Sequence, residues 1–352
     1  MRMRNATNAP SRRSVLKGAA VAAAAAVPAA AWPASSVAAA DAAVAAEDPG
    51  PLWTAEYRAR KGNDVSLYIY RKRAGGAPQP GGPPRPVLFL VHGSSLSSRP
   101  SFDLTVPGAG EYSLMNVFAR YGFDVWTMDF EGYGRSTVTA GNSDIRTGVE
   151  DLKAATEIVA RETGRSAFHF LGESSGALRA GAFAMERPDR VDRLVLEAFT
   201  WTGKGSPTLG KRAEQVEYYR THNRRKRDIE MIRSIFTRDK PGTSDPRVPE
   251  AIAAAELPLG DTVPTGTYLD MTANLPVVDP ARVRSPVLIV RGEHDGIASE
   301  EDLLDFFRRL PNPDRQFAVL AGAAHSIGLG INRQELWHTV HAFLTMPRPV
   351  AT

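Results

Sequence analysis

The strongest constraint in the sequence is a serine held in a tight turn between a strand and a helix. Residues 167–171 form a short apolar run typical of a buried strand, and the alanine-rich residues 176–185 predict a helix that ends before Pro188. Between them, residues 172–176 (Gly-Glu-Ser-Ser-Gly) fit the pattern G-x-S-x-G, in which the glycines let strand and helix approach closely. An ordinary strand-to-helix turn is the alternative, but this context favours a nucleophilic Ser174 hydroxyl beside a helix N-terminus.

Around this turn the sequence alternates between strands and helices. Short apolar runs predict strands, and longer amphipathic segments predict helices. The predicted strands are residues 53–60, 65–73, 87–91, 123–129, 167–171, 193–197, 287–290 and 316–320, and the predicted helices are residues 111–121, 149–163, 176–185, 300–310 and 334–344. The alternation predicts an α/β fold with a mostly parallel, doubly wound sheet and an antiparallel hairpin at its N-terminal end.

One long segment, residues 200–284, interrupts the alternation where a single crossover helix would suffice. We expect polar helices over residues 209–237, followed by irregular chain rich in proline and glycine. An insertion after the C-terminal end of a strand lies over the ligand crevice of such sheets, so we interpret it as a lid or cap. The core domain that carries the sheet is then expected in residues 41–199 and 285–352.

The N-terminus has the pattern of an export signal. Ser11-Arg12-Arg13-Ser14-Val15-Leu16-Lys17 is a twin-arginine motif, and an Ala/Val-rich segment follows it. Pro28 and Pro33 break this segment before it reaches the roughly 20 apolar residues of a membrane-spanning helix. We therefore predict a twin-arginine signal peptide in residues 1–40, export by the Tat machinery, a periplasmic or secreted product and no stable membrane anchor.

Composition excludes several functions. The whole chain has a net charge of +4, and residues 1–40 hold five Arg or Lys residues and no acid, so their removal leaves −1 and no basic character for nucleic-acid binding. The absence of cysteine excludes disulfides, thiolate metal sites and cysteine nucleophiles. The histidines show no metal-ligand spacing such as H-E-x-x-H and no cofactor motif is present, so we expect neither a metal nor a cofactor.

A serine hydroxyl needs a base to remove its proton, and the base needs an acid to orient it. His325, in the loop after the predicted strand 316–320, is the candidate base. Asp295, in the loop after the predicted strand 287–290, is the candidate acid, and Glu197 at the end of its own strand is the alternative. The resulting chain order of serine, aspartate and histidine is the order expected for one fold class.

With these pieces the sequence resembles the α/β-hydrolase fold family from about residue 53 to residue 344. The matching motifs are His92-Gly93 at a strand end, Asp129-Phe130-Glu131-Gly132-Tyr133-Gly134-Arg135-Ser136, the Ser174 turn, the Asp295 loop and His325. The resemblance implies a triad of Ser174, His325 and Asp295. It also implies an oxyanion hole formed by the backbone N–H groups of Ser94 and Ser175. Serine at the turn, where an aspartate would stand in a dehalogenase or an epoxide hydrolase, argues against both of those activities.

These features predict an exported serine hydrolase that cleaves a carboxylic ester of a small molecule through an acyl-enzyme. The same fold also supports amide hydrolysis, C–C bond hydrolysis, perhydrolysis or acyl transfer, and a complete triad disfavours a third hypothesis, a non-catalytic binding protein. Trp201 and Tyr268 are candidates for an apolar substrate pocket or for the interior of the lid. Residues 204–240 contain 11 Lys or Arg and 5 Asp or Glu, which indicates either a solvated helix face or a contact for an anionic group.

Overall fold

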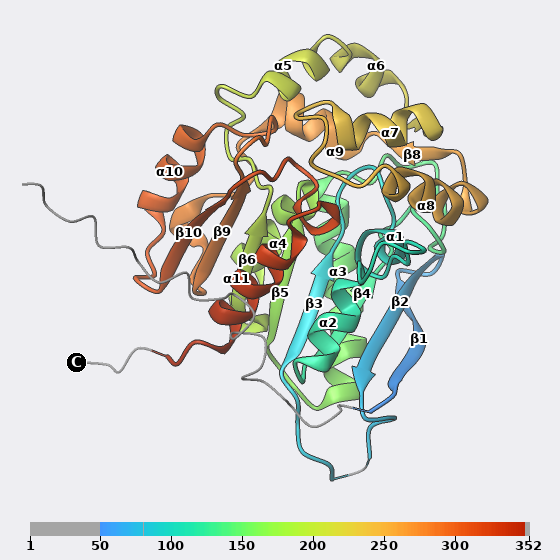
Figure 1. Cartoon of the computed structure of the whole chain (residues 1–352), viewed down its shortest axis with the longest axis vertical. Coiled ribbons are helices and arrows are strands. Elements are labelled where there is room, and N and C mark those ends of the chain that lie inside the picture. The colour runs from blue at the N-terminus through green and yellow to red at the C-terminus, as the bar shows by residue number, and fades with distance from the viewer. Residues whose placement is uncertain (1–49, 80, 349–352) are drawn as a thin grey trace, which may run out of the picture. The chain divides into compact units, whose positions relative to one another are not determined.

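An eight-stranded sheet runs through the protein (Figure 1). The computed structural model describes residues 50–79 and 81–348, so the predicted signal peptide lies outside the described residues. The strands are β1 (Leu52–Lys61), β2 (Val65–Ala74), β4 (Asp124–Met128), β3 (Val87–Val91), β5 (Phe168–Glu173), β6 (Val191–Glu197), β9 (Val287–Gly292) and β10 (Arg315–Leu320), given in their spatial order. Strand β2 runs antiparallel to β1 and β4, and all other neighbours are parallel. The predicted α/β sheet with its N-terminal hairpin is confirmed.

Helices cover both faces of this sheet (Figure 1). Helices α3 (Ile145–Thr163), α4 (Ser175–Glu186) and α10 (Glu300–Arg309) pack on one face, and α2 (Leu114–Arg120) and α11 (Arg333–Thr345) pack on the other. Every residue of β3 and β4 is buried, because helices cover both faces of the sheet at these strands. Burial of large side chains such as Phe183 and Phe343, each stabilising by about 1.5–3 kcal/mol, holds the two layers to the sheet.

Two helices begin three or four residues away from their predicted starts. Helix α2 begins at Leu114, where position 111 was expected, because the Ser113 side chain accepts a hydrogen bond from the Asn116 N–H group. Helix α3 begins at Ile145, where position 149 was expected, because Asp144 caps it by accepting from the Thr147 N–H group. In both cases a capping side chain sets the start of the helix, since it satisfies an N–H group that has no intrahelical acceptor.

The inserted residues 200–284, hereafter the cap segment, lie above one end of the sheet in Figure 1. They form α5 (Pro207–Ala213), α6 (Val216–Thr221), α7 (Ile229–Thr237), α8 (Arg247–Glu256), α9 (Gly266–Leu269) and a small antiparallel sheet of β7 (Arg224–Lys226) and β8 (Thr262–Pro264). The expectation of irregular chain after residue 237 is wrong, since α8 follows. Pro249 lies in the first turn of α8, where a proline removes no helical hydrogen bond, and Val248 and Ile252 pack against α7.

The remaining elements are short. They are α1 (Ser98–Phe102), the 3-10 turns Pro188–Arg190, Leu257–Leu259, Pro280–Arg282 and Ile327–Leu329, and a π turn at Asp270–Asn274. Among the helices in residues 50–79 and 81–348, none combines the length and the apolar character needed to cross a bilayer.

Candidate active site

Ser174 lies in a strained turn between β5 and α4. Its backbone has φ 58° and ψ −122°, a left-handed conformation that an L-residue adopts only at a cost of about 1–3 kcal/mol. The two glycines of the motif make the turn possible. A Cβ atom at Gly172 would lie 2.5 Å from the carbonyl oxygen of Gly176, and one at Gly176 would lie 2.6 Å from that of His92. Only glycine therefore lets α4 start this close to β5 and β3.

Two loops from neighbouring strands bring an imidazole and a carboxylate to this serine. His325 Nε2 lies 3.0 Å from Ser174 Oγ, and His325 Nδ1 lies 2.9 Å from Asp295 Oδ1. Ionised Asp295 only accepts hydrogen bonds, so Nδ1–H donates to it and Nε2 is left to accept the serine proton. The three side chains are nearly buried, with 8%, 4% and 5% of Ser174, Asp295 and His325 exposed. The structure thus brings together the three residues that the sequence singled out.

The two candidate acids differ in environment. Burial raises the pKa of Asp295, but the His325 charge and hydrogen bonds from His325 and the Ile297 N–H group outweigh burial, so its pKa lies below the ordinary value. Burial raises the pKa of Glu197 well above its ordinary value, and the charges of Glu173 and Asp295 add to this effect. Glu197 hydrogen-bonds the Gly328 N–H group at 3.2 Å, whereas the imidazole bonds Asp295. The geometry therefore favours Asp295 over Glu197 as the partner of His325.

Glu173, directly before the serine, is a third carboxyl group near the imidazole. Burial raises its pKa, and the His325 charge acts in the opposite direction. Glu173 and Glu197 are paired across β5 and β6, so two carboxyl groups that favour their protonated forms lie side by side behind the triad. Their proximity explains why neither replaces Asp295, since each is more easily kept neutral than ionised.

The expected oxyanion-hole residues lie against each other. Ser94 Oγ donates to Ser175 Oγ at 2.7 Å, and Thr267 Oγ1 from α9 donates to Ser94 Oγ at 2.9 Å. Ser175 is the first residue of α4, where an N–H group has no intrahelical acceptor. A cavity of about 30 Å³, roughly the volume of one water molecule, is lined by Ser94, Ser174 and His325. A carbonyl oxygen of a substrate would enter here.

His92, at the end of β3, supports this loop. Its Nε2 accepts the Phe130 N–H group at 3.2 Å and its Nδ1 donates to the Gly93 carbonyl at 2.8 Å. Complete burial and the charge of Arg179 lower the pKa of His92 to about 3, so the ring is neutral and acts as a fixed hydrogen-bonding spacer. It does not touch Ser174.

A cleft of about 800 Å³ leads from the cap segment to the triad. Its lining includes Asp295, Tyr268 and Arg212, and it shares Ser95, Arg212, Ile235 and Arg238 with the small cavity beside Ser174. Tyr268 thus lines the cleft as expected, and its hydroxyl lies 2.8 Å from Ser95 Oγ. Trp201 does not line the cleft, and of its two predicted roles its contacts agree with interior packing. Its indole donates to the Val278 carbonyl and packs on Phe306, and it lines none of the cavities found in the described residues.

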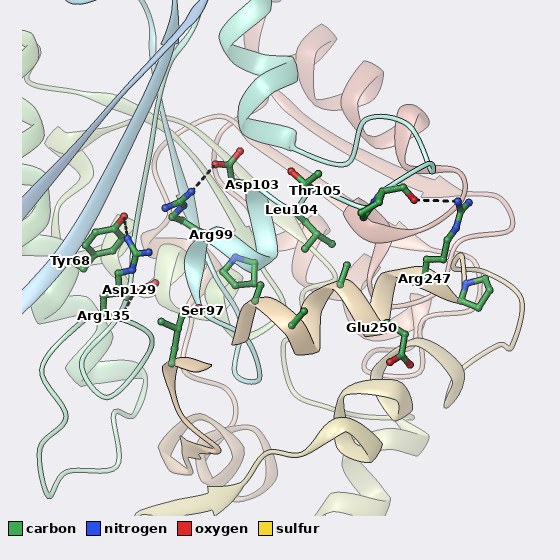
Figure 2. Close-up of a pocket in the computed structure, with 17 residues that line it drawn as sticks. Tyr68, Ser97, Arg99, Asp103, Leu104, Thr105, Asp129, Arg135, Arg247 and Glu250 are labelled. Atoms are coloured by element: carbon green, nitrogen blue, oxygen red, sulfur yellow. Dashed lines mark hydrogen bonds and ion pairs between the residues drawn. The ribbon is translucent and has the colours of Figure 1, made fainter. Parts of the chain in front are cut away.

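A second cleft, of about 860 Å³, lies between α1 and α8 (Figure 2). Its floor is mainly apolar, with Pro100, Leu104 and Ala251 among the lining residues, and it contains no member of the triad. Arg99 and Arg247 at its rim are each held by neighbouring carboxylates, Asp103 and Asp245. Of the two large clefts, only the one under the cap segment gives access to Ser174. In the described part of the chain, no group of three or more His, Asp or Glu side chains has the arrangement of a metal site.

Two residues of the site, Thr267 and Arg212, could not be predicted from the sequence. Thr267 reaches Ser94 from 173 positions away, and no local pattern marks it as a partner of the oxyanion loop. Arg212 lies in a stretch noted only for its excess of positive charge, and nothing in that stretch distinguishes it from the solvated lysines and arginines around it.

The comparisons with known proteins agree with this architecture. A family model described as "Serine aminopeptidase, S33" matches residues 82–329. A 2-hydroxy-6-oxononadienedioate/2-hydroxy-6-oxononatrienedioate hydrolase from Paraburkholderia phymatum is 32% identical over 128 residues, which are 34% of this chain and 38% of that protein. The match therefore spans well under half of the length of this curated relative.

Solved structures are similar over most of the chain. A hydrolase from Pseudomonas aeruginosa superposes with a TM-score of 0.62 at 18% identity, covering 83% of this chain and 98% of that chain. The carboxylesterase CesB from Bacillus subtilis superposes with a TM-score of 0.58 at 19% identity, covering 84% and 93% of the two chains. At these identities the similarity establishes the fold.

Proposed function

Because the chain belongs to the serine aminopeptidase S33 family of α/β-hydrolases, we propose that it is a serine hydrolase that cleaves carboxylic esters through an acyl-enzyme. The observation that carries the proposal is the continuous hydrogen-bonded line from Asp295 through His325 to Ser174, at 2.9 and 3.0 Å. A nucleophile, a base and an orienting acid in this order form the minimal machinery for acyl transfer from a serine.

The proposed reaction has two halves. Ser174 Oγ forms a bond to the ester carbonyl carbon while His325 Nε2 takes the serine proton, and the carbonyl oxygen becomes an anion between the N–H groups of Ser94 and Ser175. Collapse of this intermediate breaks the ester C–O bond, and His325 returns the proton to the departing alcohol. Water then attacks the acyl-enzyme with His325 again as base, which releases the acid and restores the Ser174 hydroxyl.

The oxyanion donors are expected to supply a large part of the rate. Main-chain donors of this type stabilise a transition state by about 2.7–4 kcal/mol each. The link from Ser175 through Ser94 to Thr267 supports this assignment, because it holds the two loops that carry the donors in one arrangement.

The test uses short 4-nitrophenyl esters and a fluorophosphonate probe. We expect the enzyme to hydrolyse the esters and to be labelled at Ser174, and we expect Ser174→Ala to lose on the order of 10⁴-fold or more in kcat and all labelling. Circular dichroism of Ser174→Ala checks that the fold is intact. A folded Ser174→Ala protein with full activity would falsify the proposal, and an unlabelled, inactive wild type would favour a non-catalytic binding protein.

Hydrolysis of a C–C bond is the second candidate, and the Paraburkholderia phymatum relative supports it. The compounds in that relative's name are oxo acids without an ester group, so their hydrolysis breaks a carbon–carbon bond. The same serine, base and oxyanion donors would serve such a reaction. Product analysis by mass spectrometry, with ester and vinylogous oxo-acid substrates offered together, separates the two candidates.

We further propose that the protein is exported through the twin-arginine pathway and acts in the periplasm or outside the cell. The motif at Arg12 and Arg13 and the apolar segment after it support this proposal. Cell fractionation tests it. Changing Arg12 and Arg13 to lysine should retain the precursor in the cytoplasm, whereas changing Arg2 and Arg4 to lysine should leave export unaffected.

A further inference from the structure

Arg212 of α5 lies where the cleft under the cap segment meets the cavity beside Ser174. It lines both spaces, as does Arg238, which follows α7. The small cavity contains the nucleophile and the oxyanion loop. A substrate whose carbonyl group occupies the small cavity therefore extends past the Arg212 guanidinium.

Two arginines of this cleft have no hydrogen-bonding or ionic partner among the described residues. In the described residues, the guanidinium groups of Arg212 and Arg225 form no hydrogen bond and no ion pair. They lie over the ring of Tyr268, with their central carbons 5.2 Å and 4.8 Å from the ring centroid. Tyr268 is in turn fixed by its contact with Ser95. The two cations are thus held by one aromatic ring and left without a counter-ion.

Two sequence neighbours of Arg225 show that other arginines of the cap segment do have polar partners. Arg224 donates to the Gly132 carbonyl and to Thr262, and Arg227 is buried in an ion pair with Glu256 at 2.5 Å. Members of one basic run therefore differ. Arg224 and Arg227 hold parts of the fold together, whereas Arg225 lines the cleft.

The positive charges of these arginines are not neutralised within the cleft. Burial, together with the charges of Arg238 and Arg225, lowers the pKa of Arg212 to about 10, so it remains charged at neutral pH under mutual repulsion. The carboxylates that line the same cleft do not offset this repulsion. Asp295 holds His325, Glu293 accepts the Gly322 N–H group, Asp239 lies beside Arg238 and Thr208, and Glu300 is exposed on α10.

We propose that Arg212 and Arg225 bind a carboxylate of the substrate, so that the preferred substrates are esters that carry a free carboxylate. This inference rests on the proposed function, because it takes the reacting carbonyl to lie beside Ser174. The planar guanidinium presents two parallel N–H groups that match the two oxygens of a carboxylate, and both guanidinium groups lie against the Tyr268 ring in the lining of the cleft.

The first test compares matched esters that differ in one charge. Mono-4-nitrophenyl adipate carries the carboxylate on the acyl side, and 4-nitrophenyl hexanoate is its neutral counterpart. 4-Butyryloxybenzoate carries it on the alcohol side, and its methyl ester is the neutral counterpart. We expect kcat/KM to favour the charged member of at least one pair by on the order of 10- to 100-fold, the usual worth of a charge-assisted hydrogen bond. Equal or lower kcat/KM for the charged member of both pairs overturns the inference.

Variants assign the preference to the arginines. Arg212→Gln and Arg225→Gln should each reduce the ratio of charged to neutral kcat/KM, and Arg212→Lys should retain part of it. Arg220→Gln is the matched control, since Arg220 carries the same charge on α6, is 56% exposed and does not line the cleft. An unchanged ratio in both Arg212→Gln and Arg225→Gln overturns the inference.

A binding measurement separates this inference from the proposed function. Adipate binding to the folded Ser174→Ala protein, measured by calorimetry, needs no catalysis, and we expect it to be lost in the Ser174→Ala, Arg212→Gln double variant. Adipate binding by a wild-type protein that hydrolyses no ester would support the carboxylate site and contradict the proposed ester hydrolysis. Binding of inorganic phosphate in place of adipate, or of neither anion, overturns the assignment to a carboxylate.

Discussion

The charged side chains at the C-terminal edge of the sheet are paired, whereas two of those that the cap segment presents to its cleft are not. At the sheet edge, Asp295 and His325 form a close pair on loops that Gly292 brings together, since a Cβ atom there would lie 2.5 Å from the Ala324 carbonyl oxygen. In the cap segment, Arg212 and Arg225 have no counter-ion in the described residues. The charges at the sheet edge are paired within the protein, whereas Arg212 and Arg225 would gain a counter-ion only from a ligand. We infer that the core determines the reaction and the cap segment selects the substrate.

The largest expected effect tests which carboxyl group at the sheet edge orients His325. Asp295→Asn removes the acceptor that fixes the Nδ1 proton, so we expect kcat on 4-nitrophenyl esters to fall by about 10⁴-fold. Glu197→Gln keeps the oxygen that accepts the Gly328 N–H group and should stay within about fivefold of wild type. Steady-state kinetics decide between the two. The reverse pattern would make Glu197 the acid.

The next effect compares paired and unpaired arginines of the cap segment. Arg227→Met leaves Glu256 buried without its cation, so we expect unfolding in urea to show a loss of about 3–5 kcal/mol. Arg212→Met removes a partly buried cation that has no anionic partner among the described residues, so its stability should equal or exceed that of wild type. Equal losses of unfolding free energy in the two variants would mean that Arg212 also stabilises the fold, and the difference between paired and unpaired arginines would not hold.

A third comparison uses two glycines. Gly176→Ala places a methyl group against the carbonyl oxygens of Val91 and His92, which are fixed at the end of β3, so we expect a loss of about 3 kcal/mol or more. Gly210→Ala in α5 meets no atom within 4 Å and should stabilise the helix by up to about 1 kcal/mol. Thermal unfolding measures both. A neutral Gly176→Ala would show that the turn adjusts, and the account of the strained serine would lose its basis.

The same division between core and cap segment explains what the sequence could predict. The core signals are local: continuous apolar strands such as residues 87–91, the glycine spacing around Ser174, and loops placed by strands of known order. Each follows from backbone sterics or from burial on two faces, and the structure brings the corresponding side chains together. The parallel sheet also places the ends of β5, β9 and β10 at one edge, so chain order alone indicated which loops would meet.

The cap segment resisted prediction because its contacts are distant in sequence. For Trp201 the sequence left both a pocket wall and a packed interior open, because an aromatic residue near a site has no local mark that separates the two. Its partner Phe306 lies on α10. The count of charged residues showed an excess of cations, but it could not tell which arginines are paired and which are not. Whether an arginine in the basic run is paired depends on Glu256 and Thr262, which only the fold brings near.

The smallest effect concerns the stability of the core as a function of pH. Glu197 is 2% exposed, and its pKa in the folded protein is raised well above 4.5 by burial and by the charges of Glu173 and Asp295. The folded state therefore binds more protons than the unfolded state between pH 4.5 and the raised pKa. Its contribution to the free energy of unfolding is fully present below pH 4.5 and is lost as the pH rises through the raised pKa.

Glu197→Gln has no proton to lose and keeps the hydrogen bond from the Gly328 N–H group, so it should remove this pH dependence. We expect the Tm of Glu197→Gln relative to wild type to increase between pH 5 and pH 9 by about 2–4 °C. Glu335→Gln on α11 is the matched control, because Glu335 is exposed and its carboxylate stays in water in both states. A constant Tm difference over this range would mean that Glu197 is ionised in the folded protein. The pair of Glu173 and Glu197 would then carry negative charge behind His325, and the assignment of a single acid at Asp295 would have to be revised.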